Sequence, residues 1–222
     1  MATERGVEAY VLCLTDGQAA TARGTAESGE ALGRMRRQEF SDSCRVLGVR
    51  HHELLDYQDG RLEFAEFSRA AGRIVERMRR FQPDLVLTFG ADGALNTHAD
   101  HMLVSALTTA SFHWSGRERR YPELARPYQP KRLYTLSTEV FLPDRQPPLP
   151  SPWSVRLDVS GVLSRKMEAF RAHVSQAPLM ERTEEFFRDH GRYEFYTLAA
   201  DARPQPATLS YDLFADDGIA CG

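Results

Sequence analysis

The chain has 222 residues, with 28 Lys and Arg against 31 Asp and Glu and a formal net charge of −3. This near-balance disfavours a general nucleic-acid binder, which carries a strong excess of basic residues. With 42% hydrophobic and 27% charged residues, the composition is that of a globular protein with a real core. No apolar run approaches the roughly 20 residues that a membrane-spanning helix needs. The 3 cysteines are widely separated and form neither a disulfide framework nor a CxxC metal motif. We therefore expect a cytoplasmic protein.

The first half of the chain alternates short apolar runs with segments of helical periodicity. Four elements are assigned on this basis: strands at 8–14 and 52–55, and helices at 30–47 and 64–81. Pro83 ends the last of these helices. Residues 84–89 follow as an almost uninterrupted apolar strand, which is typical of a parallel strand covered on both faces. Another helix is expected over residues 99–112. This alternation with short joints predicts an α/β sandwich with a mainly parallel sheet.

Beyond residue 115 the periodicity is weaker. Proline-rich stretches at 116–130 and 143–152 predict loops. The remaining elements are expected as follows: strands within 131–141 and at 194–198, and helices at 160–174 and 180–189. The end of the chain is rich in Pro and Asp. We therefore predict a single domain over residues 1–203 and a loosely ordered tail over 204–222.

The segment from Phe89 to His101 (FGADGALNTHADH) is the most informative for chemistry. It follows the carboxyl end of a predicted parallel strand, where open α/β sheets place their ligands. His98 and His101 lie three residues apart with Asp100 between them. On the first turn of a helix this spacing places both imidazoles on the same side. Neutral imidazole is a good zinc ligand, and a helix N-terminus disfavours its protonated form.

A structural interpretation of the same residues stays open. Thr97 and Asp100 match a capping-box-like pattern, in which Asp100 only satisfies backbone N–H groups. Two polar histidines at a loop–helix junction can also be simply exposed. In addition, two histidines fall short of the three protein ligands that are usual at a catalytic zinc. The spacing therefore indicates a metal or catalytic role without establishing one.

Several further motifs occur in a fixed order along the chain. They are Leu12-Cys-Leu-Thr-Asp-Gly17, Arg36-Arg-Gln-Glu39 followed by Val46-Leu-Gly-Val49, Tyr57-Gln-Asp-Gly60, Pro83-Asp-Leu-Val-Leu-Thr88 before His98-Ala-Asp-His101, Lys166 to His173-Val-Ser-Gln176, and Tyr193-Glu-Phe195. Each motif alone is weak. Their order and spacing resemble the PIG-L/LmbE family of zinc-dependent de-N-acetylases over roughly nine-tenths of the chain, with Ala99 replacing the usual Pro.

The resemblance also shows a departure at the start of the chain. The family begins with a strand and an Ala-His-Pro-Asp-Asp-Glu motif, whose His and second Asp bind zinc and whose first Asp acts on the water. This sequence has no such motif, and residues 1–8 resemble the end of the first family helix. We interpret the chain as starting at an internal Met, through a misassigned start or a shortened form. A degenerate protein is the competing explanation.

The resemblance implies a three-layer α/β sandwich with a mainly parallel, Rossmann-like sheet that lacks the family's first strand and helix. Because that strand would lie inside the sheet, its loss leaves ladder groups unpaired on the neighbouring strands. Buried unsatisfied backbone groups cost about 1–3 kcal/mol each. We therefore expect this chain to be poorly soluble or to need a partner that completes its sheet.

The implied function is that of a zinc-dependent hydrolase that removes an N-acetyl group from an N-acetylglucosamine-type sugar or glycoconjugate, with weak or no activity in this form. His101 is then the remaining Zn²⁺ ligand. His98 stabilises the oxyanion or protonates the departing amine, and Asp100 orients an imidazole. Arg36, Asp59 and Asn96 are the expected substrate-binding residues, with Asn96 placed to donate to the same oxyanion.

Three of the family positions also have a structural alternative. Arg36 lies in a run of arginines, which is usually a solvated helix face, and Asp59 precedes Gly60 and suits a turn. His173 matches the family but also suits helix packing. For the whole chain, the alternative function is a non-catalytic relative that binds sugar or serves as an assembly subunit. Formation of a homo-oligomer is left open.

Overall fold

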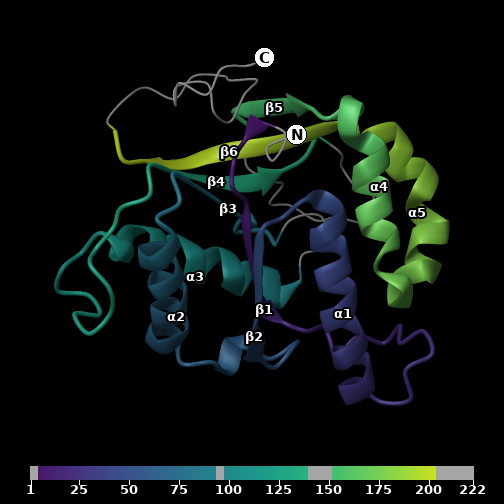
Figure 1. Ribbon diagram of the computed structural model, residues 1–222, viewed down its shortest axis with the longest axis horizontal. Coiled ribbons are helices and arrows are strands. Elements are labelled where there is room, and N and C mark those ends of the chain that lie inside the picture. The colour runs from purple at the N-terminus through teal and green to yellow at the C-terminus, as the bar shows by residue number, and fades with distance from the viewer. Residues whose placement is uncertain (1–4, 94–97, 140–151, 204–222) are drawn as a thin grey trace. The chain divides into compact units, whose positions relative to one another are not determined.

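The structure is a computed structural model that describes residues 5–93, 98–139 and 152–203. Within these residues the fold is α/β, as predicted (Figure 1). The chain divides into two compact units. In the described residues, unit 1 comprises 5–61 and 158–194, and unit 2 comprises 62–157 and 195–203 apart from the undescribed stretches. The predicted tail at 204–222 lies outside the described residues, and the single-domain organisation stays a prediction.

Unit 1 contains a parallel pair of strands joined by a helix. Strands β1 (Tyr10–Thr15) and β2 (His51–Tyr57) pair in parallel, and α1 (Gly29–Leu47) makes the crossover that such a pair requires. The Ser28 side chain caps α1 by accepting the N–H of the third residue that follows it. Gly48 ends the helix in the left-handed conformation with φ 71°. The predicted end of this helix at residue 47 is therefore confirmed.

The second part of unit 1 is helical. Its elements are η4 (Ser160–Val162), α4 (Leu163–Arg171), η5 (Val174–Gln176) and α5 (Ala177–His190). Helix α4 packs against α1 and α5 packs against α4, with the rings of Phe170 and Phe187 5.0 Å apart. The predicted helix at 160–174 is thus too long. It ends at Arg171, after which the His173 N–H donates to the Phe170 carbonyl three residues back and the Ser175 N–H donates to Glu39.

Unit 2 is built around a four-stranded sheet in the order β3-β4-β6-β5. The strands are β3 (Leu85–Thr88), β4 (Arg132–Ser137), β5 (Val155–Asp158) and β6 (Tyr193–Asp201). β3 pairs with β4 in parallel, whereas β4 pairs with β6 antiparallel. The sequence predicts three of these strands and misses β5, a four-residue strand that follows a proline-rich stretch.

Three helical segments complete unit 2: η2 (Leu62–Phe64), α2 (Phe67–Phe81) and α3 (Ala99–Ser115). α2 packs against α3, and the buried residues of this unit include Val75 and Phe112. α2 begins later than the predicted residue 64, because the Glu66 carboxylate caps it by accepting two backbone N–H groups.

β3 departs from the expectation that both faces of this strand are covered. The Leu87 side chain is 46% exposed. Among the described residues, β3 hydrogen-bonds only with β4, and β1 only with β2, so each is the edge strand of its sheet. A strand with one paired neighbour receives less cover from adjacent side chains than an interior strand does. The interpretation that a family strand is missing stays a prediction.

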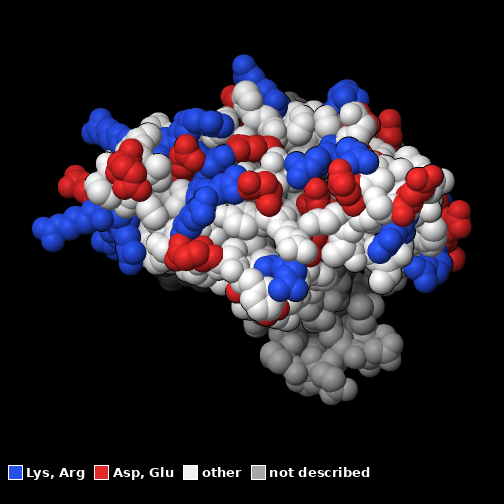
Figure 2. All heavy atoms as spheres, turned by 90° about the horizontal axis from the view of Figure 1, so that it is seen from below, with Lys and Arg blue, Asp and Glu red and all other residues white. Residues whose placement is uncertain are grey.

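The surface has a mixed charge distribution. On the face shown in Figure 2, acidic and basic side chains are interspersed over the described residues, in agreement with the small net charge. Among the helices that the structure describes, not one combines the length and the apolar character needed to cross a membrane.

Candidate functional site

His98 is the N-terminal cap of α3. Its backbone is extended, with φ −66° and ψ 135°, and its Nδ1 accepts the N–H of Asp100 at 3.1 Å. A neutral imidazole that accepts a hydrogen bond at Nδ1 carries its proton at Nε2. The local fold therefore makes His98 a hydrogen-bond donor at Nε2.

His101 has the opposite tautomer. Its Nδ1 lies 3.1 Å from the carbonyl oxygen of Gly93. A carbonyl only accepts, so Nδ1 carries the proton and Nε2 carries the lone pair, as in an imidazole that binds a metal. The His101 ring also stacks on Phe89, with the centroids 4.0 Å apart and the planes 2° from parallel. The carbonyl and the aromatic ring together fix the orientation of this imidazole.

The two imidazoles lie together at the start of α3. Their ring centroids are 5.4 Å apart and their planes are inclined by 42°. The pair combines one N–H donor and one lone pair in fixed orientations. Within the described parts of the chain, no three His, Cys, Asp or Glu residues form a group that could hold a metal ion. His101 therefore suits one zinc ligand, but these residues alone do not complete a site with three protein ligands.

Asp100 is buried beside the two histidines. Its Oδ1 accepts the backbone N–H of Leu62, the first residue of η2, at 3.1 Å. Asp100 thus satisfies a backbone N–H, as the structural interpretation anticipates, but this N–H belongs to η2 and not to α3. Thr97, the other half of the predicted capping box, and Asn96, a predicted substrate residue, lie outside the described residues.

Arg36 and Asp59 lie in unit 1 and contact the same loop, residues 15–19. The Asp59 carboxylate accepts the N–H of Ala19 at 3.1 Å and the hydroxyl of Thr15 at 3.4 Å. Arg36 Nη1 donates to the carbonyl oxygen of Gly17 at 2.9 Å. These two predicted substrate residues therefore hold one loop from α1 and from the loop after β2. Asp59 also lies in a turn, in which the Arg61 N–H donates to the Gln58 carbonyl at 3.2 Å, and its substrate role stays a prediction.

The three arginines at the start of α1 differ in their surroundings. Arg34 pairs with Glu30 on an exposed face, and Arg37 Nη2 binds the Asp16 carboxylate at 2.9 Å. Arg36 is partly buried, and its Nε has no hydrogen-bond partner in the described chain. The run of basic residues is thus not a uniformly solvated face.

The structure also reveals a contact that the sequence does not predict. Glu39 is 4% exposed and Ser175 is 1% exposed. The Ser175 N–H and hydroxyl donate to the two oxygens of Glu39 at 2.6 and 2.8 Å. His173 Nδ1 lies 4.0 Å from Glu39 Oε2. Both motifs were visible in the sequence, but no local pattern links residues that are 136 positions apart.

The environment of His173 favours its neutral form. Burial is the largest cause and lowers the pKa of the imidazole; Glu39 raises it and the positive charge of Arg36 lowers it. The net result is a pKa below the ordinary value of 6.5. His173 is therefore neutral at pH 7, with one side of its ring facing a buried carboxylate.

Known proteins resemble this chain in sequence. The mycothiol S-conjugate amidase of Streptomyces coelicolor is 26% identical over 150 residues, a match that covers 58% of this chain and 50% of the amidase. The 1D-myo-inositol 2-acetamido-2-deoxy-alpha-D-glucopyranoside deacetylase of Salinispora arenicola is 25% identical over 237 aligned positions. That match covers 89% of this chain and 76% of the deacetylase. The chain thus spans half of the first relative and about three quarters of the second.

A solved structure supports the fold. The N,N'-diacetylchitobiose deacetylase of Pyrococcus horikoshii superposes with a TM-score of 0.70 at 24% identity, covering 89% of this chain and 74% of the deacetylase. At that identity the likeness carries the fold alone. The PIG-L family, described as GlcNAc-PI de-N-acetylase, matches residues 1–112, which is half of the chain. As the order of its sequence motifs predicts, the protein belongs to the PIG-L family.

Proposed function

We propose that the protein is an amidohydrolase that removes an N-acetyl group from an N-acetylglucosamine-type sugar or glycoconjugate. The family and the deacetylases among its relatives support this reaction class. The observation that carries the proposal is the pair of imidazoles of His98 and His101, 5.4 Å apart and with complementary tautomers. Because the chain spans only half of the amidase, activity and substrate are both part of the proposal.

His98 is the proposed donor to the reacting group. Hydrolysis of an amide passes through a tetrahedral intermediate with a negatively charged oxygen, which a preorganised N–H donor stabilises. The hydrogen bond from Asp100 N–H to Nδ1 keeps the proton of His98 on Nε2 before substrate arrives. A neutral imidazole is too weak an acid to give up its only proton to the departing amine, so the role proposed for His98 is that of oxyanion donor.

His101 is the proposed zinc ligand, through Nε2. A bound zinc ion would polarise the acetyl carbonyl and lower the pKa of its water. The Gly93 carbonyl and the Phe89 ring hold the imidazole in the required tautomer and orientation. Asp100 acts as a positioning residue, because its contact with Leu62 joins η2 to the start of α3.

The remaining assignments are supported by their family positions. We propose that Arg36 and Asp59 bind the sugar together with the 15–19 loop that both contact, since a guanidinium and a carboxylate suit hydroxyl groups. Asn96 is proposed as a substrate residue on family position alone. Location in the cytoplasm and formation of a homo-oligomer stay predictions.

One observation favours the second candidate, a non-catalytic relative that binds sugar. The described residues lack a group of three metal-ligating side chains. A chain that cannot hold its metal tightly would keep a sugar-binding surface without turnover. The two candidates differ in zinc content and in acetate release.

The test compares wild type, His101→Ala and His113→Ala, whose residue lies on the same helix with an exposed side chain. We measure bound zinc after gel filtration and acetate released from N-acetylglucosamine derivatives, before and after chelation. The enzyme proposal predicts zinc binding and turnover that are weak in wild type and in His113→Ala, because the chain as given holds one expected zinc ligand, and loss of both in His101→Ala. His98→Ala is expected to lower kcat by about 10²–10³-fold. Zinc and turnover that persist in His101→Ala would contradict the site. Sugar binding without zinc or turnover would support the second candidate.

A further inference from the structure

His173 occupies a rigid turn between α4 and η5. Its N–H donates to the Phe170 carbonyl at 3.0 Å, and its own carbonyl accepts the N–H of Gln176 at 2.8 Å. Two residues along, Ser175 is joined to both oxygens of Glu39. This double contact ties the turn to α1, so the backbone that carries His173 has little freedom to move.

The imidazole of His173 has one occupied side and one available side. Its Nδ1 faces the Glu39 carboxylate at 4.0 Å, which favours the tautomer with the proton on Nδ1. The lone pair is then on Nε2, for which the described residues supply no hydrogen-bond partner. An imidazole oriented by a carboxylate with its second nitrogen available is the arrangement found where histidines accept protons or hydrogen bonds from ligands.

The surroundings argue against a pure packing role. The His173 side chain is about a third exposed, and the neighbouring Val174 is 68% exposed, so the turn lies at the surface of unit 1. The Glu39 carboxylate accepts both donors of Ser175 and lies 4.0 Å from His173 Nδ1, so its charge favours one orientation of the ring without a hydrogen bond to it. The lowered pKa keeps Nε2 unprotonated at pH 7.

Arg36 lies three residues before Glu39, on the same face of α1, and its guanidinium carries hydrogen-bond donors. Its positive charge lowers the pKa of His173. One of its N–H groups binds the Gly17 carbonyl, and its Nε has no partner in the described residues. A hydroxyl group both donates and accepts, so it matches an acceptor beside donors. A carboxylate or phosphate ligand would be repelled by Glu39.

We propose that His173 forms a subsite in unit 1 for a hydroxyl group of a sugar or polyol. The hydroxyl donates a hydrogen bond to His173 Nε2, Glu39 orients the imidazole, and Arg36 lies on the same helix face as Glu39. The ligand class rests on the proposed function. The proposal assigns His173 a role in binding a hydroxyl group of the ligand, and Glu39 a role in orienting the ring.

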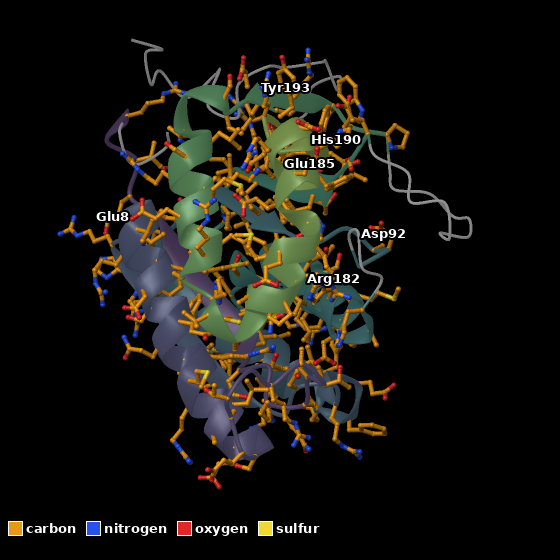
Figure 3. All side chains as sticks on the ribbon, turned by 90° about the vertical axis from the view of Figure 1, so that its right-hand side faces the viewer. Glu8, Asp92, Arg182, Glu185, His190 and Tyr193 are labelled. Atoms are coloured by element: carbon orange, nitrogen blue, oxygen red, sulfur yellow. The ribbon has the colours of Figure 1, made fainter. Side chains whose placement is uncertain are left out.

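The test uses the full chain with N-acetylglucosamine as the probe. The ring protons of His173 are followed by NMR during the titration, and affinity is measured by calorimetry. His173→Phe keeps a ring but removes the acceptor, and His173→Gln restores an acceptor. His190→Gln is the matched control, because this exposed histidine lies on α5 of the same unit (Figure 3).

We expect the probe to shift the His173 resonances and to bind at least tenfold more weakly to His173→Phe, with partial recovery in His173→Gln and no change in His190→Gln. In Glu39→Gln, loss of the carboxylate is expected to lower the pKa of His173 further, because Glu39 raises it. This change would report that Glu39 faces the ring, whereas the affinities of the His173 variants report on ligand binding. If Glu39→Gln does not fold, the His173 variants carry the test.

The outcomes separate this inference from the proposed function. Acetate release by wild type with unchanged affinity in His173→Phe would overturn the inference and leave the deacetylase proposal intact. Binding that shifts His173 without acetate release would support the inference and count against the deacetylase. Absence of binding, or binding that leaves the His173 resonances unchanged, would overturn the inference.

Discussion

Replacing Arg79 by Met should strongly destabilise the protein. Arg79 is a buried residue of α2. Among the described residues, its hydrogen-bond partners are backbone carbonyls and not carboxylates. Its N–H groups make five hydrogen bonds of 2.7–3.2 Å, to the carbonyl oxygens of Ser115, Arg117, Arg120, Tyr121 and Ala125. One guanidinium therefore holds the end of α3 and the loop that follows it.

The magnitude follows from what the carbonyls can do after the substitution. A hydrogen bond to a charged donor contributes about 1.5–3 kcal/mol. The carbonyls in the exposed part of the loop can bind water instead, whereas Ser115 is fully buried and its carbonyl keeps only the N–H of Tyr128, at 3.0 Å. Met also removes a buried charge, which offsets part of the loss. We expect a destabilisation of about 3–5 kcal/mol, because several hydrogen bonds to a charged donor are lost and water replaces them only in part. That is a large share of the 5–15 kcal/mol typical of a folded protein.

Urea unfolding followed by circular dichroism measures this change. Arg80→Met is the control, because Arg80 is exposed on the same helix, and we expect less than about 0.5 kcal/mol for it. The free energy of unfolding of Arg79→Lys should lie between those of wild type and Arg79→Met, since an ammonium has three donors for five carbonyls. If Arg79→Met fails to fold, Arg79→Lys supplies the value. A free energy of unfolding for Arg79→Met within about 0.5 kcal/mol of wild type would refute the reasoning.

Two further substitutions test the loops around the candidate residues. Gly17→Ala should lower the free energy of unfolding in urea more than Gly6→Ala does. Both glycines have positive φ, but only at Gly17 would the new Cβ collide with the Arg36 guanidinium. Equal losses in the two variants would contradict the contact. Asp100→Ala should cost about 1–3 kcal/mol by leaving the Leu62 N–H without its acceptor. Asp100→Asn keeps an acceptor and should stay folded, so a loss of acetate release in this variant would report on the charge alone. Equal free energies of unfolding for Asp100→Ala and Asp100→Asn would contradict the structural contact.

The sequence predicts elements well where local chemistry decides them. Ser28 and Gly48 bound α1 because an N-cap side chain and a left-handed glycine act within one turn. β5 is missed because four residues after a proline-rich stretch carry no period, and its strand character comes from pairing with β6. The exposure of Leu87 is equally non-local, since it depends on which strands lie beside β3.

In the candidate site, too, the sequence predicts what is local and misses what depends on distant residues. The spacing of His98 and His101 correctly places two imidazoles at the start of a helix, 5.4 Å apart. Their tautomers were not predictable, because the Gly93 carbonyl that fixes His101 comes from the preceding loop. The contact of Asp100 with Leu62 was hidden for the same reason, as it spans 38 positions in the sequence.

Two residues of the Arg36–Glu39 motif, about one helical turn apart, hydrogen-bond α1 to two different segments of unit 1. Arg36 binds the Gly17 carbonyl, and Glu39 binds both donors of Ser175. Residues three apart lie on the same face of a helix, so the two contacts leave α1 on the same side. A displacement of α1 would therefore move the 15–19 loop and the turn of His173 together. Because both segments carry proposed ligand contacts, the motif couples their positions, and a substitution that shifts α1 should weaken sugar binding at both.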